Sequence, residues 1–268
     1  MKQIDSQHSL PGPEDITHVT LSNGITLLAR PNFSSPSIVV GGHLPCGALF
    51  DPPEKLGLAD FTATALMRGT DKYSFQQIYD LLESNAANLS FACGTHTAGF
   101  TGRALAEDLP LLLGLLADIL FHPVFPPDEI ERLRAQLLTG LAIRAQDTAD
   151  MALLTFDQVV FEGHPYALPE DGWPETIQAI RRDDLADFHA RHYGPAGMVL
   201  AVVGAVEPQK AIEQVEKFLG KWHNPRQPQP PELPPLQPLQ NTTRSKVSIP
   251  GKTQSDIVIG ARDRKSVV

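Results

Sequence analysis

A glycine-bounded run of small and apolar residues at 57–70 restricts the local structure more than any other part of the chain. Its apolar side chains recur at the spacing of one buried helix face, at Leu58, Phe61, Ala65 and Leu66. Gly69 follows the last of them and is a suitable C-terminal stop. The pattern therefore predicts a short, buried helix. Residues four apart share a helix face, so Asp60 and Thr64 lie on the same side of it.

The frame Gly-Leu-Ala-x-Phe-x-x-x-x-Leu-x-x-Gly-Thr in this run resembles the zinc-binding helix of the insulinase/pitrilysin metallopeptidases, the family of mitochondrial processing peptidase. Active members carry His-x-x-Glu-His there. A gapless overlay places the first histidine on Asp60, the glutamate on Ala63 and the second histidine on Thr64. The resemblance implies a zinc metalloendopeptidase fold in which this helix has lost its metal ligands and its general base.

The resemblance also implies a third zinc ligand, a glutamate on a later helix, and the corresponding position is Gly140. A catalytic zinc site needs three protein ligands and a water molecule, whereas Asp60 is the one reliable donor among these four positions. The sequence therefore predicts no catalytic residue and no metal ligand at Asp60, Ala63, Thr64 and Gly140.

The rest of the chain predicts an α+β fold, a mixed and largely antiparallel sheet with helices packed on one face. Residues 17–31, with Asn23-Gly24 between two apolar segments, are typical of a β-hairpin. Residues 37–44 are predicted to form a third strand, and residues 198–204 a buried central strand. Residues 88–103 are typical of a strand pair. Gly-His-Pro-Tyr at 163–166 and the pattern of the helix at 183–193 match further signatures of the same family.

These patterns divide the chain into an N-terminal tail (1–15), a family-type domain (16–222) and a proline-rich linker (223–242). Residues 243–262 are expected to begin a second, truncated domain of the same type, with strands at 246–250 and 255–260. Residues 263–268 do not continue that strand, and we interpret them as a truncation scar.

In active relatives an edge strand receives the substrate backbone by strand addition. The resemblance places that strand at Leu89, Ser90, Phe91 and Ala92, which are therefore candidate peptide-binding residues.

Composition excludes several other classes of protein. A net charge of −9 and a pI near 5.4 argue against nucleic acid as a partner. The absence of eighteen consecutive apolar residues and of a signal peptide predicts no membrane span and a cytoplasmic location, with the periplasm as the alternative. Two cysteines, Cys46 and Cys93, make no disulfide framework.

Several histidines and one cysteine could in principle bind a metal or act as a nucleophile, but a structural role is the simpler interpretation of each. His189 and His192 are spaced i, i+3 on a helix, yet that helix is structural in the family. His43, His96 and His164 are scattered, and each is expected to be an ordinary hydrogen-bonded histidine. Cys93 lies in a Gly/Ala/Thr strand without any sign of a lowered thiol pKa, so a nucleophilic role is not expected.

The sequence therefore predicts a non-catalytic subunit of an insulinase-like zinc peptidase. Its expected partner is a catalytic subunit of the same family that carries His-x-x-Glu-His and the zinc ion, with peptide substrate held in a chamber between the two. Two alternatives stay open: a zinc peptidase that uses displaced ligands, and a scaffold resembling the core subunits of the respiratory cytochrome complex.

Overall fold

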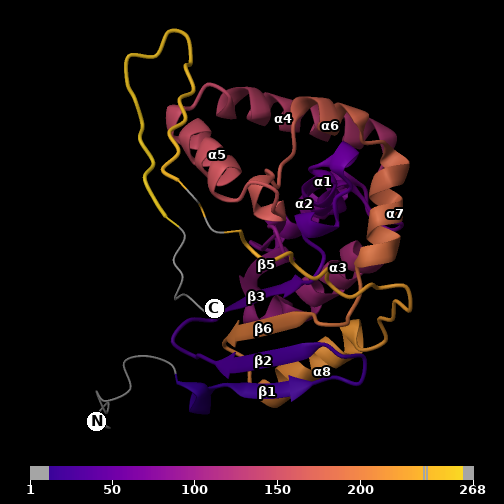
Figure 1. The fold of residues 1–268 in the computed structure, drawn as a ribbon. Helices are drawn as coiled ribbons and strands as arrows, with labels where there is room; N and C mark the ends of the chain where they lie inside the picture. The colour runs from indigo at the N-terminus through magenta and orange to yellow at the C-terminus, as the bar shows by residue number, and fades with distance from the viewer. Residues whose placement is uncertain (1–11, 238, 240, 262–268) are drawn as a thin grey trace.

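A six-stranded sheet organises residues 12–237, 239 and 241–261, the part of the chain that a computed structural model describes (Figure 1). The strands are β1 (Thr17–Thr20), β2 (Thr26–Pro31), β3 (Ser37–Leu44), β4 (Asn88–Cys93), β5 (Ala98–Leu105) and β6 (Val199–Gly204). They lie in the order β1-β2-β6-β3-β5-β4. Only the β2–β6 pair is parallel within this sheet, which confirms the predicted mixed, largely antiparallel class.

The first hairpin forms where the Asn-Gly signal predicts it. Gly24 has φ of +94°, a left-handed conformation that glycine adopts without strain. Its amide donates to the Leu21 carbonyl, and the Leu21 amide donates to the Ile25 carbonyl. The Asn23 side chain donates to the carbonyls of Leu219 and Trp222 at 2.9 and 3.2 Å, which ties this turn to the end of the last helix.

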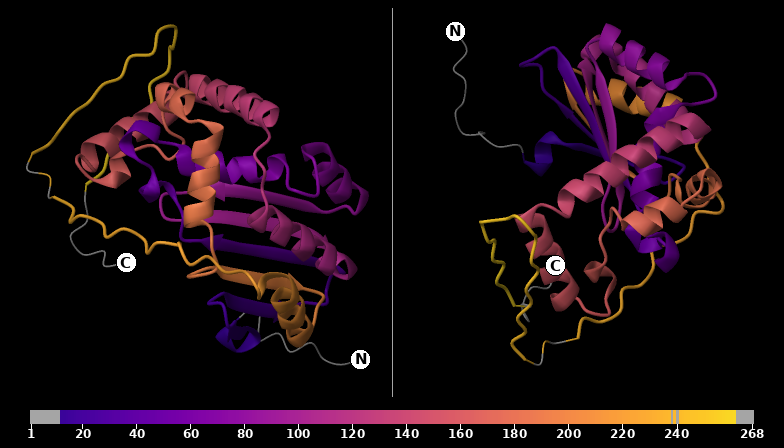
Figure 2. Two further views of the ribbon diagram at one scale, coloured as in Figure 1. Left: turned by 90° about the vertical axis from the view of Figure 1, so that its right-hand side faces the viewer. Right: turned by 90° about the horizontal axis from the view of Figure 1, so that it is seen from above.

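Two helices cover one face of the sheet. They are α3 (Leu109–Phe121) and α8 (Pro208–Leu219), which pack side by side and against β5 and β2 (Figure 2). Leu27 and Ala29 of β2, and Leu200 and Val202 of β6, point to that side and are buried. The alternate residues of the same strands are more exposed, as the two-residue period of a strand requires. This arrangement confirms that helices pack on one face.

The other helices gather beyond the β4 side of the sheet (Figure 1). They are α1 (Leu58–Ala65), α2 (Phe75–Ser84), α4 (Pro127–Arg144), α5 (Thr148–Val160), α6 (Pro174–Ala179) and α7 (Arg182–His192). Short 3-10 helices lie at Pro13–Asp15, Ala48–Phe50, Pro53–Lys55, Leu66–Arg68, Ala106–Asp108 and Pro165–Ala167. Because α1 packs against both α7 and β4, the first predicted helix sits where the edge strand meets the helices.

The C-terminal segment differs from the prediction. Residues 246–250 and 255–260 were expected to be strands, but neither forms one among the described residues. A strand needs a neighbouring ladder for its backbone groups, and this segment lies against α5 rather than against a sheet. Ile257 and Ile259 remain 81% and 90% exposed. The assignment of 243–262 to a second domain stays a prediction, and the proposed scar at 263–268 and residues 1–11 of the tail lie outside the described residues.

Candidate functional site

Helix α1 is fixed at its N-terminus by the carboxylate of a half-buried aspartate. Asp51 accepts hydrogen bonds from the backbone amides of Gly57 and Ala59, both at 2.8 Å. Burial raises the pKa of Asp51 to about 7, although those two hydrogen bonds act in the opposite direction. Gly57 has φ of +91°, and a Cβ added there would lie 2.7 Å from the Ile177 side chain, so glycine is required.

The three α1 positions that correspond to the zinc motif offer few donors. Ala63 is fully buried and contributes a methyl group. The Thr64 hydroxyl donates to the Asp60 carbonyl at 2.5 Å, so it is committed to its own helix. The Asp60 carboxylate is therefore the one anionic group on this face of α1.

Asp60 lies in an environment that disfavours its charge. Burial is the main cause that raises its pKa to about 6, and the neighbouring carboxylates of Asp171 and Glu170 add to the effect. A hydrogen bond from the backbone of Cys93 partly offsets the rise. The carboxylate is thus held against the end of β4 rather than against another helix.

Gly140 lies on α4, which packs beside α1: the Arg134 guanidinium carbon on α4 is 5.2 Å from the centroid of the Phe61 ring. Gly140 itself is exposed, and a Cβ added there would have no heavy atom within 4 Å. Within the described residues, no group of three His, Cys, Asp or Glu side chains could hold a metal ion. The side chains at Asp60, Ala63, Thr64 and Gly140 therefore do not fit the zinc ion that the family implies.

The histidines considered from the sequence have separate structural contacts. His189 contacts the Leu120 carbonyl through Nε2 at 2.9 Å, and His192 stacks between Phe50 and Phe188. Burial lowers the pKa of each of these two histidines to about 4.

His164 and His96 belong to a different part of the structure. The Nδ1 atom of His164 accepts from the Tyr166 amide, and the Nε2 atom of His96 lies 2.8 Å from the Tyr166 hydroxyl. His43 lies on β3, on the sheet face away from α3 and α8. None of these five histidines takes part in a metal-type cluster of described residues.

The two cysteines and Tyr193 lie in the same region as Asp60. Tyr193 is fully buried, and burial raises the pKa of the Cys46 thiol to about 12. Burial likewise raises the pKa of the Cys93 thiol, and the nearby Asp60 carboxylate adds to that rise. Because a thiol attacks as its thiolate, these shifts argue against a nucleophilic role for either cysteine.

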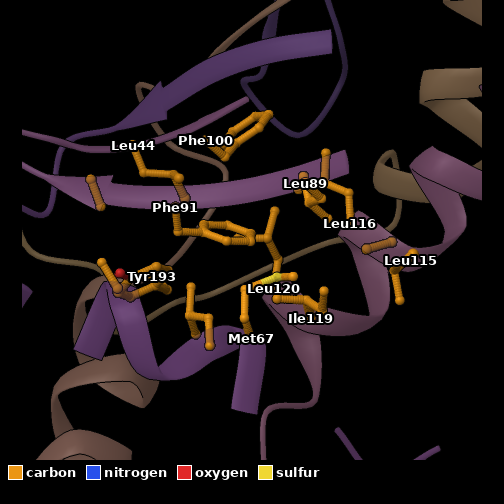
Figure 3. Packing of buried hydrophobic residues seen from close by; sticks show 14 of the residues in the cluster. Leu44, Met67, Leu89, Phe91, Phe100, Leu115, Leu116, Ile119, Leu120 and Tyr193 are labelled. Atoms are coloured by element: carbon orange, nitrogen blue, oxygen red, sulfur yellow. The ribbon is translucent and has the colours of Figure 1, made fainter. Parts of the chain in front are cut away.

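Strand β4 is an edge strand, as expected, since β5 is its one neighbour in the sheet. Leu89 and Phe91 point into the core, toward Met67 and the α3 residues Leu116 and Leu120 (Figure 3). Ser90 and Ala92 are exposed. A peptide at this edge would therefore contact the β4 backbone and these two small side chains, whereas Leu89 and Phe91 serve packing.

The β4–β5 register shows which backbone groups face outward. The Gly94 amide donates to the Thr97 carbonyl at 2.9 Å, so Gly94 and Thr97 form a hydrogen-bonded pair. Hydrogen-bonded and non-hydrogen-bonded pairs alternate along an antiparallel ladder, so the pairs that Cys93, Phe91 and Leu89 form with β5 are not hydrogen-bonded. The amides and carbonyls of Leu89, Phe91 and Cys93 consequently point away from β5. Because Cys93 is also the backbone partner of Asp60, the Asp60 carboxylate caps one end of this open edge.

Sequence reasoning missed the polar groups that hold this region together. Arg144 of α4 forms an ion pair with Asp171 and donates to the Gly172 carbonyl at 3.1 Å. The Thr95 hydroxyl of the β4–β5 turn donates to Glu170. Asp51 precedes Gly57 by six residues, too far for a local helix-capping signal. These contacts depend on tertiary structure.

The fold and this site define a class of protein: a mixed α/β domain in which α1 carries Asp60, Ala63 and Thr64 and the described residues offer no group of side chains that could hold a metal ion. The chain belongs to the insulinase family, peptidase family M16. The model of that family matches residues 31–160, and the model of the peptidase M16 inactive domain matches residues 179–262. The predicted family is therefore confirmed.

Two curated relatives illustrate the range of the family. The chain is 27% identical over 215 residues to a probable mitochondrial-processing peptidase subunit beta of Arabidopsis thaliana, covering 80% of this chain and 40% of the relative. It is 28% identical over 205 residues to cytochrome b-c1 complex subunit 1 of Homo sapiens, covering 76% and 42%. The chain thus spans about two fifths of the length of these relatives.

A solved structure supports the fold. The crystal structure of a peptidase M16 inactive domain from Pseudomonas fluorescens superimposes with a TM-score of 0.72 at 23% identity. The match covers 83% of this chain and 53% of that one. Among the residues that the structure describes, no helix is long and apolar enough to cross a membrane.

Proposed function

We propose that this chain is part of a non-catalytic subunit of an insulinase-like zinc peptidase and assists peptide hydrolysis by a partner subunit. The observation that carries the proposal is the contrast at α1. The family fold and the edge strand are intact, whereas Asp60, Ala63, Thr64 and Gly140 do not form a ligand set. Without the metal, no bound water is activated for attack, and Ala63 provides no general base.

In this proposal the partner is a catalytic M16-family subunit that carries His-x-x-Glu-His and the zinc ion, and the two subunits form a heterodimer. The relatives named as a processing-peptidase subunit and a cytochrome complex subunit support a role within an assembly. The β4 edge would hold the backbone of a peptide by strand addition, with Leu89, Ser90, Phe91 and Ala92 as the strand residues. We further propose that the protein is bacterial and cytoplasmic, with the periplasm as the alternative location. Cell fractionation would distinguish the two locations.

Zinc content is the first test, and the control is a restored variant. The purified chain is expected to hold almost no zinc after dialysis. The quadruple variant Asp60→His, Ala63→Glu, Thr64→His, Gly140→Glu is expected to hold about one zinc per chain, because it supplies the three ligands of a catalytic site. A stoichiometric zinc in the unmodified chain, with chelator-sensitive peptide hydrolysis, would establish the displaced-ligand alternative instead.

Reconstitution tests the subunit role. Adding the full-length protein to a family subunit that carries His-x-x-Glu-His is expected to raise kcat/KM for peptide cleavage, while the protein alone cleaves nothing. Unchanged kinetics over a range of subunit ratios would contradict the proposal.

A scaffold role is the second candidate, and the similarity to cytochrome b-c1 complex subunit 1 favours it. It predicts stable copurification with a respiratory membrane complex and no effect on peptide cleavage. The same reconstitution experiment therefore separates the two candidates.

A further inference from the structure

The sheet has an uncovered face, on the side away from α3 and α8, which we call the open face. It consists of the strand residues that alternate with the buried ones, and it includes Val39, His43, Thr101 and Arg103 as exposed residues. Val203 and Arg30 lie on the same face and are partly exposed. In the part of the chain that the structure describes, no helix packs on this side of β2, β6 and β3.

Charge on the open face is of one sign. The six strands contain no aspartate or glutamate, although the whole chain has a net charge of −9. Arg30 and Arg103 point to the open face, together with the imidazoles of His18 and His43. A basic surface on an acidic protein indicates a partner of opposite charge.

The two arginines have no partner of their own. Neither guanidinium makes an ion pair or a side-chain hydrogen bond with another described residue, and the Nε atom of Arg30 is buried without an acceptor. By contrast, Arg68, Arg132, Arg134, Arg144 and Arg182 all contact carboxylates. The donors of the open face are therefore free to bind an external acceptor.

Strand register aligns these arginines across the sheet. Arg103 of β5 pairs with Val39 of β3, Val39 pairs with Val203 of β6, and Val203 pairs with Arg30 of β2. Three interstrand spacings separate the two arginines, a span of roughly 14 Å. Between them lie two valine side chains and no charged group. Arg103, Val39, Val203 and Arg30 thus form a row with a cation at each end and an apolar centre.

We propose that the open face binds an extended acidic peptide that crosses the strands, with carboxylates four residues apart on Arg103 and Arg30. Four steps of extended chain cover about 13 Å, close to the arginine separation, and side chains at i, i+2 and i+4 point to the same side. An apolar residue at i+2 then rests on Val39 and Val203. Guanidinium groups bind carboxylates through two parallel hydrogen bonds, which makes arginine suited to this role.

A nucleic acid fits this face less well. Its phosphates follow at close intervals and are matched by dense lysine and arginine clusters, whereas the row offers two permanent cations on a protein of charge −9. Two charges with an apolar centre match a short polypeptide motif instead. The proposal goes beyond the proposed function, because the open face is a peptide-binding surface separate from the β4 edge.

Direct binding tests the inference without any partner subunit, so its outcome is independent of the reconstitution experiment. Fluorescence anisotropy at low ionic strength would compare labelled Glu-Ala-Val-Ala-Glu with Gln-Ala-Val-Ala-Gln and Lys-Ala-Val-Ala-Lys. We expect binding of the glutamate peptide alone, weakening as salt is added. Arg103→Gln is expected to weaken it about tenfold, since it removes a charge-assisted hydrogen-bonded pair.

The matched control is Arg191→Gln, an exposed arginine on α7 away from the sheet, which should leave the affinity unchanged. Arg103 is exposed, so its variant should keep the circular dichroism spectrum and thermal midpoint of the unmodified chain. Equal binding of the glutamate and glutamine peptides, or an unchanged affinity in Arg103→Gln, would overturn the proposal. Tighter binding of a single-stranded oligonucleotide of the same charge would overturn it in favour of a nucleic acid.

Discussion

The α1–β4 junction and the open sheet face carry opposite charge and use it differently. At the junction, each carboxylate has a partner within the protein. Asp51 caps α1, Asp60 accepts a hydrogen bond from the backbone of Cys93, and Asp171 forms an ion pair with Arg144. On the open face, Arg30 and Arg103 have no such partners among the residues that the structure describes. Charge at the junction therefore serves the fold, whereas charge on the open face is available for binding.

The largest expected effect is on the junction, through Gly57→Val. The added side chain would meet Ile177 and force a β-branched residue into the left-handed conformation that Gly57 adopts at φ of +91°. We expect a loss of about 3 kcal/mol in the free energy of unfolding, measured by urea denaturation. Gly140→Ala is the matched control, because open space surrounds that position on an exposed helix. Gly140→Ala should stabilise the protein by about 0.5–1 kcal/mol. A similar loss of unfolding free energy in both variants would refute the conclusion that position 57 requires glycine.

Much of this architecture was predictable, because local signals coincide with the tertiary structure. The Asn23-Gly24 turn, the alternation in β3 and the apolar run in β6 are set by nearby residues. The periodicity of α1 was sufficient for the same reason. Where local pattern and packing agree, sequence alone places the element.

The parts that sequence did not predict depend on distant contacts. The caps and ion pairs of the junction join residues far apart in the chain, such as Arg144 with Asp171 and Thr95 with Glu170. The row from Arg103 to Arg30 exists only because β6 inserts between β2 and β3. Conversely, residues 255–260 have the composition of a strand, but the described part of the chain has no neighbouring strand with which they could pair. Strand order and tertiary partners are not written in a local pattern.

A second prediction concerns the pH dependence of the junction, through Asp60→Asn. The folded-state pKa of Asp60 is raised to about 6 from 3.8, so the folded protein binds the proton more tightly than the unfolded chain does. Its contribution to stability is fully present below pH 3.8 and is lost as the pH rises through 6. Asparagine keeps an acceptor for the Cys93 amide without the charge. The free energy of unfolding of the variant, relative to that of the unmodified protein, should therefore increase by on the order of 1–2 kcal/mol between about pH 4 and pH 7.

Urea denaturation across that pH range measures the difference between the two proteins. Glu232→Gln removes an exposed carboxylate in the linker and should track the unmodified protein at every pH. A stability difference that stays constant with pH in Asp60→Asn would show that the Asp60 carboxylate is not held in a desolvated position.

The smallest effects should come from paired arginine variants, one from each region. Arg144→Gln removes the ion pair with Asp171, the hydrogen bond to the Gly172 carbonyl, and the stacking of the guanidinium on Trp173 at 5.5 Å. Because Asp171 is 44% exposed, solvent screens the ion pair, and we expect a loss of about 1 kcal/mol in all. Arg103→Gln breaks no hydrogen bond or ion pair among the described residues, so its free energy of unfolding should change by less than about 0.5 kcal/mol. An equal loss in the two variants would mean that Arg103 also serves the fold, and the division between structural charge at the junction and binding charge on the open face would fail.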